Sequence, residues 1–225
     1  MDENSIEQEC FGDDNLLVSF GGVNQAYGIP VFEFKNVLKK IKCDKLFIRD
    51  LRQAWYHLDS DSNVNGLLKL KERLRERIGQ GNYKRVVFLG SSMGGFAAIY
   101  FGSILRVDKI IAFSPQSFID RFYRTIYVDR RWRSQIRELR IRADKSNEPN
   151  VCFDLKRHLE NLNTECDIEI LYAKKHRLDR IHSNRLKAIK GVNLMPMNSN
   201  DHSLVKDLRN SGDLYNIINR SLIIK

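Results

Sequence analysis

The sequence lacks the long apolar run that a membrane-spanning helix requires. No stretch of about 18 apolar residues occurs along its 225 residues, so we expect no transmembrane helix. The segment from Met1 to Gln8 is acidic and polar, whereas a secretory signal has a basic start followed by an apolar core. These features together favour a cytoplasmic protein.

Cysteines are few, and the common cofactor motifs are missing. The four cysteines are Cys10, Cys43, Cys152 and Cys166, and they form no C-x-x-C pair. Their scatter argues against a disulfide scaffold or a zinc site and favours a reducing compartment. The sequence has no H-E-x-x-H metal motif, no G-x-x-x-x-G-K-[ST] phosphate loop and no G-x-G-x-x-G after its first strand. We therefore expect neither a metal nor another cofactor.

The residues that are present predict a folded α/β protein. Hydrophobic residues make up 42% of the chain and aromatics 10%, which argues against disorder. Short apolar runs alternate with segments of helical spacing, so we expect a mostly parallel central sheet of about six strands with helices on both faces. The length suits a single domain over residues 1–225. The expected strands are 16–20, 45–48, 85–89, 109–113, 167–172 and 192–197.

Helices are expected between these strands. Apolar spacing predicts them at 31–41, 67–78, 94–105, 152–162 and 178–189, with another starting in 201–209 and a closing one around residues 214–222. The stretch 118–150 is the longest without a convincing strand. We expect it to form a small basic cap or insertion over the site.

One motif carries the chemistry. Gly90-Ser91-Ser92-Met93-Gly94 matches G-x-S-x-G, with a β-branched strand ending at it and an apolar helix starting from it. Strand, tight turn and helix form the setting of a nucleophile elbow, in which the serine hydroxyl is raised above the sheet edge. The flanking glycines allow the strand and the helix to approach closely. The spacing selects Ser92 over Ser91; the alternative is a glycine-rich turn that only packs.

The run VVFLGSSMGGFAAIYFG resembles the elbow strand and helix of the α/β-hydrolase superfamily, and the strand order extends this resemblance more weakly over most of the chain. The segments LFIRDLRQAWYHLD and IIAFSPQSF are similar to bacterial hydrolase-like domains found near polysaccharide and glycosyltransferase genes. The resemblance implies a compact α/β-hydrolase fold and serine-based chemistry.

A serine nucleophile needs a base, and the base needs an orienting acid. The superfamily's chain order is nucleophile, acid, histidine. His202 follows the last expected strand, where the resemblance places the base; the alternative is an exposed loop histidine. Asp179 follows a late strand and is the expected acid, unless it only interacts with a helix N-terminus. Asp201 and Asp120 are the competing carboxylates.

The tetrahedral intermediate needs two aligned N–H donors. Met93, directly after the nucleophile, is expected to supply one, and Gly22 in Phe20-Gly21-Gly22 the other. The family's usual His-Gly-x appears here without the histidine, which a backbone donor tolerates. The alternative is an ordinary turn that ends the strand.

Further residues follow strands at the same expected edge of the sheet, where ligands of open α/β sheets bind. A substrate pocket is therefore expected from Gly21, Trp55, Tyr56, Ser114 and Gln116. Packing in the core is an equal alternative for Trp55.

The formal net charge is +10, which favours anionic partners. The excess is densest over residues 121–142, called here the Arg-rich segment, which contains Arg121, Arg124, Arg130, Arg131, Arg133, Arg137, Arg140 and Arg142. It is either a solvated helix or a docking surface for nucleic acid, anionic lipid or an acidic substrate. No zinc finger, RNA-recognition signature or basic zipper accompanies it.

The leading hypothesis is hydrolysis of an ester or thioester through an acyl-enzyme on Ser92, with a small-molecule or carrier-linked acyl substrate. Acyl transfer to a sugar or another alcohol would use the same residues. A non-catalytic hydrolase-like domain that binds an anionic partner through the Arg-rich segment is the third hypothesis. The sequence does not indicate the acyl group or the oligomeric state.

Overall fold

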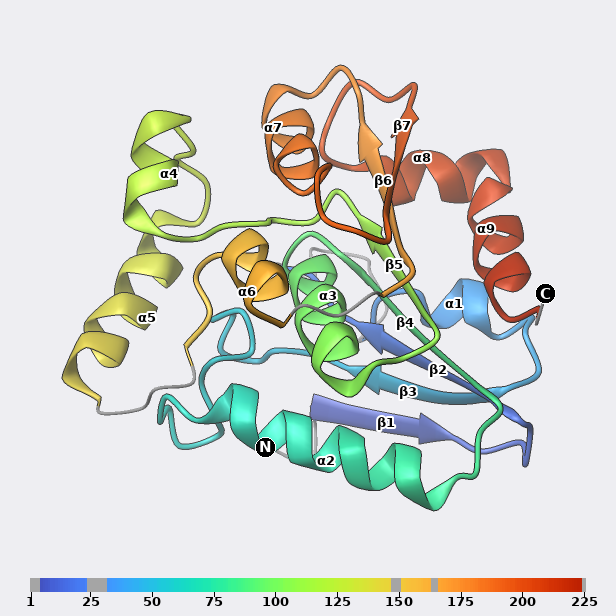
Figure 1. Ribbon diagram of the computed structural model, residues 1–225. Helices are drawn as coiled ribbons and strands as arrows, with labels where there is room; N and C mark the ends of the chain where they lie inside the picture. The colour runs from blue at the N-terminus through green and yellow to red at the C-terminus, as the bar shows by residue number, and fades with distance from the viewer. Residues whose placement is uncertain (1–4, 24–31, 147–150, 163–165, 224–225) are drawn as a thin grey trace.

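The computed structural model describes residues 5–23, 32–146, 151–162 and 166–223. Its centre is a seven-stranded sheet in the order β1-β3-β2-β4-β5-β6-β7 (Figure 1). Only β1 runs antiparallel to its neighbour. The strands are β1 (Ile6–Glu9), β2 (Asn15–Phe20), β3 (Asp44–Ile48), β4 (Arg85–Ser91), β5 (Lys109–Phe113), β6 (Ile168–Ala173) and β7 (Val192–Met197). The predicted α/β class and mostly parallel sheet are confirmed.

The helices lie between the strands and after the last one. They are α1 (Lys35–Leu38), α2 (Gly66–Gln80), α3 (Met93–Leu105), α4 (Arg121–Ile126), α5 (Arg133–Lys145), α6 (Leu155–Leu162), α7 (Arg177–Arg185), α8 (Leu204–Ser211) and α9 (Asp213–Ser221). The helix expected over 31–41 is only the single turn α1, and residue 31 lies outside the described residues. No helix in the described part of the chain is long and apolar enough to cross a membrane.

Two apolar clusters cover the two faces of the sheet. Leu16, Val18 and Phe20 of β2 pack with residues of α2, α3 and α6 on one face. Leu17 points the other way and packs with residues of α1, α8 and α9. Successive side chains of a strand point to opposite faces, so a parallel strand covered on both sides is apolar along its whole length. This explains why the central strands are continuous apolar runs in the sequence.

The strand order reverses between β2 and β4. The chain passes from β2 to β3 on one side and then crosses back to β4 on the other. Loops that leave the carboxyl ends of two such strands diverge and open a crevice, which is the usual ligand site of open α/β sheets. The loops at this position carry Gly21 and Gly22 after β2, and Ser92 after β4.

The Arg-rich segment forms α4, α5 and the turn between them. Figure 1 shows these two helices set apart from the sheet, beyond the end toward which the β2 and β3 arrows point. That placement fits the cap expected over 118–150, whose last residues, 147–150, lie outside the described part. Its role as a cap stays a prediction.

Candidate active site

Ser92 stands at a strained corner between β4 and α3. Its backbone has φ 53° and ψ −112°, a conformation that residues other than glycine rarely adopt. Such strain costs about 1–3 kcal/mol and persists only when the surroundings hold it. Here the Ser92 amide donates to the Phe113 carbonyl at 2.9 Å, and the Phe96 amide donates to the Ser92 carbonyl at 3.0 Å. The hydroxyl is thereby fixed at the carboxyl end of the sheet.

The glycines of the motif are required by contacts between backbone atoms. A Cβ on Gly94 would lie 2.1 Å from the Phe20 carbonyl oxygen, and one on Gly90 would lie 2.2 Å from the Gly94 carbonyl oxygen. Neither oxygen belongs to a side chain that could move away. The close approach of strand and helix that the motif indicated is therefore present in the structure.

Three side chains from separate loops form one hydrogen-bonded chain. Ser92 Oγ lies 2.9 Å from His202 Nε2, and His202 Nδ1 lies 2.7 Å from Asp179 Oδ1. Ser92 follows β4, Asp179 lies in the first turn of α7 after β6, and His202 lies between β7 and α8. Ser92 is 7% exposed and Asp179 1% exposed. The structure thus brings together the three residues that the sequence named.

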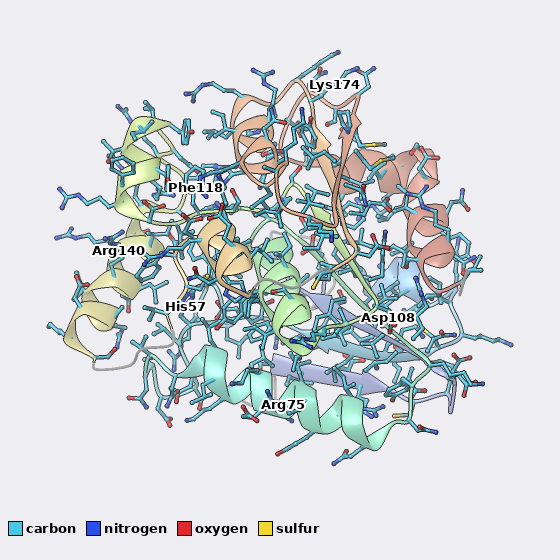
Figure 2. All side chains as sticks on the ribbon, viewed as in Figure 1. His57, Arg75, Asp108, Phe118, Arg140 and Lys174 are labelled. Carbon is cyan, nitrogen blue, oxygen red and sulfur yellow. The ribbon has the colours of Figure 1, made fainter. Side chains whose placement is uncertain are left out.

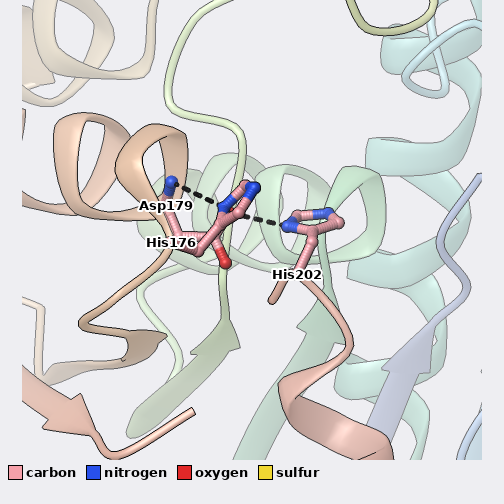
Figure 3. Close-up of side chains that lie close together, drawn as sticks. All are labelled: His176, Asp179 and His202. Atoms are coloured by element: carbon pink, nitrogen blue, oxygen red, sulfur yellow. Dashed lines mark hydrogen bonds and ion pairs between the residues drawn. The ribbon is translucent and has the colours of Figure 1, made fainter. Parts of the chain in front are cut away.

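Asp179 is kept as a carboxylate by its neighbours. Burial by itself would raise its pKa, but the hydrogen bond with His202 and the charges nearby hold the pKa below its ordinary value. His176 Nδ1 lies 2.8 Å from the same Oδ1 atom, and Figure 3 shows both histidines facing Asp179. His202, His176 and Asp179 offer ligand atoms within 4.8 Å of one another. A metal bound there would take as ligands the Asp179 and His202 atoms that are now hydrogen-bonded to each other, so it would replace that hydrogen bond.

A buried ionic network connects the Arg-rich segment to Asp179. Arg131 donates two hydrogen bonds to the Asp129 carboxylate, from Nε at 3.0 Å and from Nη2 at 2.9 Å. Its Nη1 lies 3.6 Å from Asp179 Oδ1. His182 Nε2 lies 3.1 Å from Asp129 Oδ2, while His182 Nδ1 accepts from the Ser117 amide at 3.0 Å. Burial lowers the pKa of His182 to about 4, so this histidine is neutral and donates to Asp129. The turn between α4 and α5 is in this way tied to α7.

The expected oxyanion donor Gly22 already has a partner. Its amide donates to Glu33 Oε2 at 2.8 Å. Burial raises the pKa of Glu33 to about 7. Met93, the other expected donor, is the first residue of α3, and the amide at that position has no acceptor within its own helix. The Met93 amide therefore can donate without breaking a bond within its helix. The Gly22 amide already donates to the Glu33 carboxyl group.

Sequence reasoning missed Glu33, Arg131 as a partner of Asp179, and His176. Glu33 falls in a segment whose spacing indicated a helix, so nothing singled it out. Arg131 was one arginine among many. His176 stands three residues before Asp179, a spacing that brings two side chains together in a first helical turn, and this signal could have found it.

The expected pocket residues lie at the same edge but bind one another. Trp55 Nε1 donates to Gln116 Oε1 at 3.1 Å, and Tyr56 Oη donates to the Gly21 carbonyl at 2.9 Å. All of these side chains are buried, as is Ser114. A direct contact with substrate stays a prediction.

The two competing carboxylates accept hydrogen bonds from nearby backbone amides. Asp201 Oδ1 accepts from the Ser203 amide at 2.7 Å. Asp120 Oδ1 accepts from the Tyr123 amide at 2.9 Å and caps α4. The structure gives Asp179, not these two, the hydrogen bond with His202.

No family model matches the sequence, and no curated protein matches it. Solved structures do match. A capsule O-acetyltransferase of Neisseria meningitidis serogroup A is 16% identical, with a TM-score of 0.61, over 95% of this chain and 90% of that one. A fluorophosphonate-binding serine hydrolase, FphF of Staphylococcus aureus, is 12% identical, with a TM-score of 0.59, over 94% and 84%.

A third neighbour is the Glycosylation Associate Protein (Gap123) complex of Streptococcus agalactiae, which is 18% identical with a TM-score of 0.59. The match covers 97% of this chain but only 46% of that one, so this chain spans less than half of its length. Identities this low show the fold alone. The chain has the α/β-hydrolase fold, which confirms the resemblance of its elbow to that superfamily.

Proposed function

We propose that this chain is a serine enzyme that hydrolyses an ester or thioester through an acyl-enzyme on Ser92. The observation that carries the proposal is the unbroken hydrogen-bonded chain from Ser92 through His202 to Asp179. A serine hydroxyl is a weak nucleophile unless an oriented base removes its proton. The α/β-hydrolase fold and the similarity to a fluorophosphonate-binding serine hydrolase support the proposal.

In the first half of the reaction, His202 Nε2 takes the proton of Ser92 Oγ as that oxygen attacks the carbonyl carbon. Asp179 holds the Nδ1–H of His202 and stabilises the imidazolium that forms. The imidazolium then gives its proton to the departing alcohol or thiol, and the acyl group remains on Ser92. In the second half, His202 removes a proton from water, which attacks the acyl carbon. The bond between that carbon and Ser92 Oγ then breaks, the imidazolium returns its proton to Ser92 Oγ, and the acid is released.

The negative oxygen of the tetrahedral intermediate needs donors at about 2.7–3.1 Å. The proposal assigns the amides of Met93 and Gly22 to this role. Because Gly22 now donates to Glu33, the substrate oxygen must displace the Glu33 carboxyl group to receive this bond. Glu33 would thus control one of the two donors.

The second candidate is acyl transfer to an alcohol, in which an acceptor hydroxyl replaces water in the deacylation step. One solved neighbour is a capsule O-acetyltransferase, a histidine-to-alanine mutant of which is described in complex with CoA, and another is a glycosylation complex. These favour a thioester donor and a sugar acceptor within the same scheme. Product analysis with candidate sugars in the presence of acetyl-CoA separates transfer from hydrolysis.

Kinetics of substituted enzymes test the assignment. With p-nitrophenyl acetate, Ser92→Ala and His202→Ala should each lower kcat by roughly 10⁴-fold or more, and Asp179→Asn by about 10³- to 10⁴-fold. Asp201→Asn is the matched control, because it removes the carboxylate that neighbours His202 along the chain but leaves the Asp179 bond intact. Its kcat should stay within about twofold.

Two outcomes would contradict the proposal. If Asp201→Asn lowered kcat as much as Asp179→Asn does, the assignment of Asp179 as the acid would be wrong. If the unmodified protein showed no turnover and retained an anionic polymer through the Arg-rich segment, the non-catalytic alternative would hold.

A further inference from the structure

A large cavity lies between α4 and α5, outside the Ser92 site. Its volume is about 790 Å³, within the range of cavities that hold small-molecule ligands. Six arginines line it: Arg121, Arg124, Arg130, Arg133, Arg137 and Arg140. Figure 2 shows Arg140 on α5, on the side of the molecule where α4 also lies. The Arg-rich segment is therefore the wall of a concave site.

Acidic side chains neutralise little of this charge. The carboxylates in the lining are Asp129 and Asp144. Asp129 already accepts two hydrogen bonds from Arg131 and one from His182, so its charge is largely compensated by Arg131. The cavity wall keeps a clear excess of positive charge, and like charges gathered in a concave wall repel one another unless an anion enters.

Two guanidinium groups in the wall carry buried nitrogens that have no hydrogen-bond partner within the described residues. They are Nη1 of Arg124 and Nη1 of Arg140. The Arg124 side chain is only 10% exposed, and its Nη1 lies 3.9 Å from Asp129 Oδ1, which is too long for a hydrogen bond. Its Nη2 is fixed by the Arg131 carbonyl at 2.5 Å. A buried donor without an acceptor is unfavourable, and it would be satisfied if either side chain turned its nitrogen toward an anionic oxygen in the cavity.

Arg140 is held in place by a ring. Its guanidinium carbon stands 5.6 Å from the centre of the Phe153 ring. A cation at this distance from a ring is attracted by the ring, which favours this position of the guanidinium group. Arg124 on α4 and Arg140 on α5 thus line the cavity from its two helices.

The other part of the cavity wall is aliphatic. Ile119, Ile136, Val128 and Ile141 line it. Val128 is 54% exposed and Ile141 44% exposed, although both are large apolar residues. Exposed apolar side chains beside charged ones offer a ligand both kinds of contact. The cavity would therefore suit a ligand that has an anionic part and an apolar part.

We propose that the cavity between α4 and α5 binds a diphosphate that is joined to an apolar or weakly polar group. The guanidinium fork matches phosphoryl oxygens in geometry, and arginines spread over two helices can engage two phosphoryl groups at once. A concave cavity with aliphatic walls suits a small molecule better than a nucleic acid strand, which binds in grooves with aromatic stacking platforms. The inference concerns the cavity alone and does not depend on the chemistry of Ser92.

Calorimetric titration of inorganic pyrophosphate into the full-length Ser92→Ala protein tests the site, because that variant cannot turn over an acyl substrate. We expect one saturable site. The double variant Arg137→Gln with Arg140→Gln should weaken binding by about tenfold per arginine. Arg75→Gln is the matched control, since Arg75 lies on α2 away from the cavity and pairs with Glu72 (Figure 2); it should change the affinity by less than about twofold.

Arg140→Lys keeps the charge and provides a test even if the glutamine variant fails to fold. It should still lose about tenfold in affinity, because an ammonium group cannot replace the guanidinium fork. Farnesyl diphosphate and CoA then distinguish two sources of the diphosphate. Tighter binding of either compound than of pyrophosphate supports the proposal and identifies the attached group.

Three results would overturn the proposal. The first is the absence of saturable binding of pyrophosphate, farnesyl diphosphate and CoA. The second is an equal loss of affinity in the Arg75→Gln control, which would mean general attraction to a basic protein. The third is equal binding of inorganic sulfate and pyrophosphate, which would mean a single-anion site.

Discussion

Two carboxyl groups near Ser92 have opposite environments. Asp179 is buried, yet its bond with His202 keeps its pKa below the ordinary value. Glu33 receives the amide of Gly22, but burial dominates and raises its pKa to about 7. Near neutral pH, Asp179 is therefore an anion, whereas Glu33 changes between a neutral acid and an anion. This difference gives the two groups different roles: one orients the base, and the other responds to pH beside an oxyanion donor.

Glu33→Gln should change the pH dependence of turnover. Above about pH 7 the Glu33 carboxylate accepts the Gly22 amide most strongly and opposes a negative oxygen at the same place. The glutamine variant keeps an acceptor there but has no charge. We expect the ratio of kcat/KM in the variant to that in the unmodified enzyme to rise by roughly tenfold between pH 6 and 8. A ratio that stays constant across this range would show that Glu33 does not control the donor.

The same raised pKa has a consequence for stability. The folded protein retains the Glu33 proton between about pH 4.5 and 7, where the unfolded chain has lost it. This contribution to stability is therefore complete below pH 4.5 and is lost as the pH rises through 7. Urea titrations should show that Glu33→Gln removes this part of the pH dependence, which provides a readout independent of turnover.

Among single residues, the sequence predicted those whose role follows from their order along the chain. The G-x-S-x-G spacing selected Ser92, and the order of nucleophile, acid and histidine selected Asp179 and His202, which the structure brings within hydrogen-bonding distance. Their catalytic roles stay a prediction. Glu33 could not be found, because its contact with Gly22 is a tertiary hydrogen bond that no periodicity in the sequence encodes.

Among the elements, the pair β4 and α3 decides the position of the nucleophile. The helix starts so close to β2 that a single methyl group on Gly94 would meet the Phe20 carbonyl. The distance between these elements is set by backbone atoms, so it cannot be relieved by a side-chain rotation. The site depends on this contact before any catalytic group is considered.

Gly94→Ala should therefore destabilise the fold by about 3 kcal/mol or more, because backbone must shift to admit the methyl group. Gly79→Ala in α2 is the matched control, since a Cβ there would have no atom within 4 Å. It should stabilise the protein by about 0.5–1 kcal/mol, the usual gain for this change in a helix. Urea unfolding measures both. Equal stability of the two variants would contradict the close approach.

Element prediction succeeded where burial produces a regular pattern. Six strands lie within about two residues of their expected bounds. The central ones are apolar runs because parallel strands covered on both faces are apolar throughout, whereas the edge strand β7 is only half-buried. Strand β1 was missed because its sequence, IEQE, has one apolar residue followed by three polar ones, and it lies at the edge of the sheet. The helix expected over 31–41 is shortened because Phe34 adopts φ 66°, which a helix cannot continue through. Hydrophobic periodicity does not report such a backbone turn.

On the scale of the whole molecule, buried neutral histidines join distant segments. His57 Nδ1 lies 3.0 Å from the Ala54 carbonyl oxygen, and its Nε2 lies 2.9 Å from the carbonyl oxygen and 3.1 Å from the amide nitrogen of Cys152. His182 joins α7 to the Arg-rich segment through Asp129. Burial lowers the pKa of each to about 4. Protonation of either ring would place a charge in the interior.

Stability should therefore fall on mild acidification. The unfolded chain binds protons at these histidines below about pH 6.5, and the folded protein does so only below about pH 4, so stability is lost as the pH falls between these values. Each histidine should remove about 2 kcal/mol from the free energy of unfolding between pH 7 and 5. Urea unfolding at the two pH values, repeated on His57→Gln, should show a smaller loss in the variant. Glu33 opposes this loss equally in both proteins, so an equal change in the two free energies of unfolding would contradict neutral burial of His57.

The central claim is that the Ser92 hydroxyl is an activated nucleophile, and labelling with a fluorophosphonate tests it most directly. Intact-mass spectrometry of the unmodified protein should show the addition of one probe, and peptide mapping should place it on Ser92. Ser91→Ala, which removes the adjacent hydroxyl, should still be labelled, whereas Ser92→Ala should not. Labelling of Ser92→Ala to the same extent, or a probe mapped to another residue, would contradict the account.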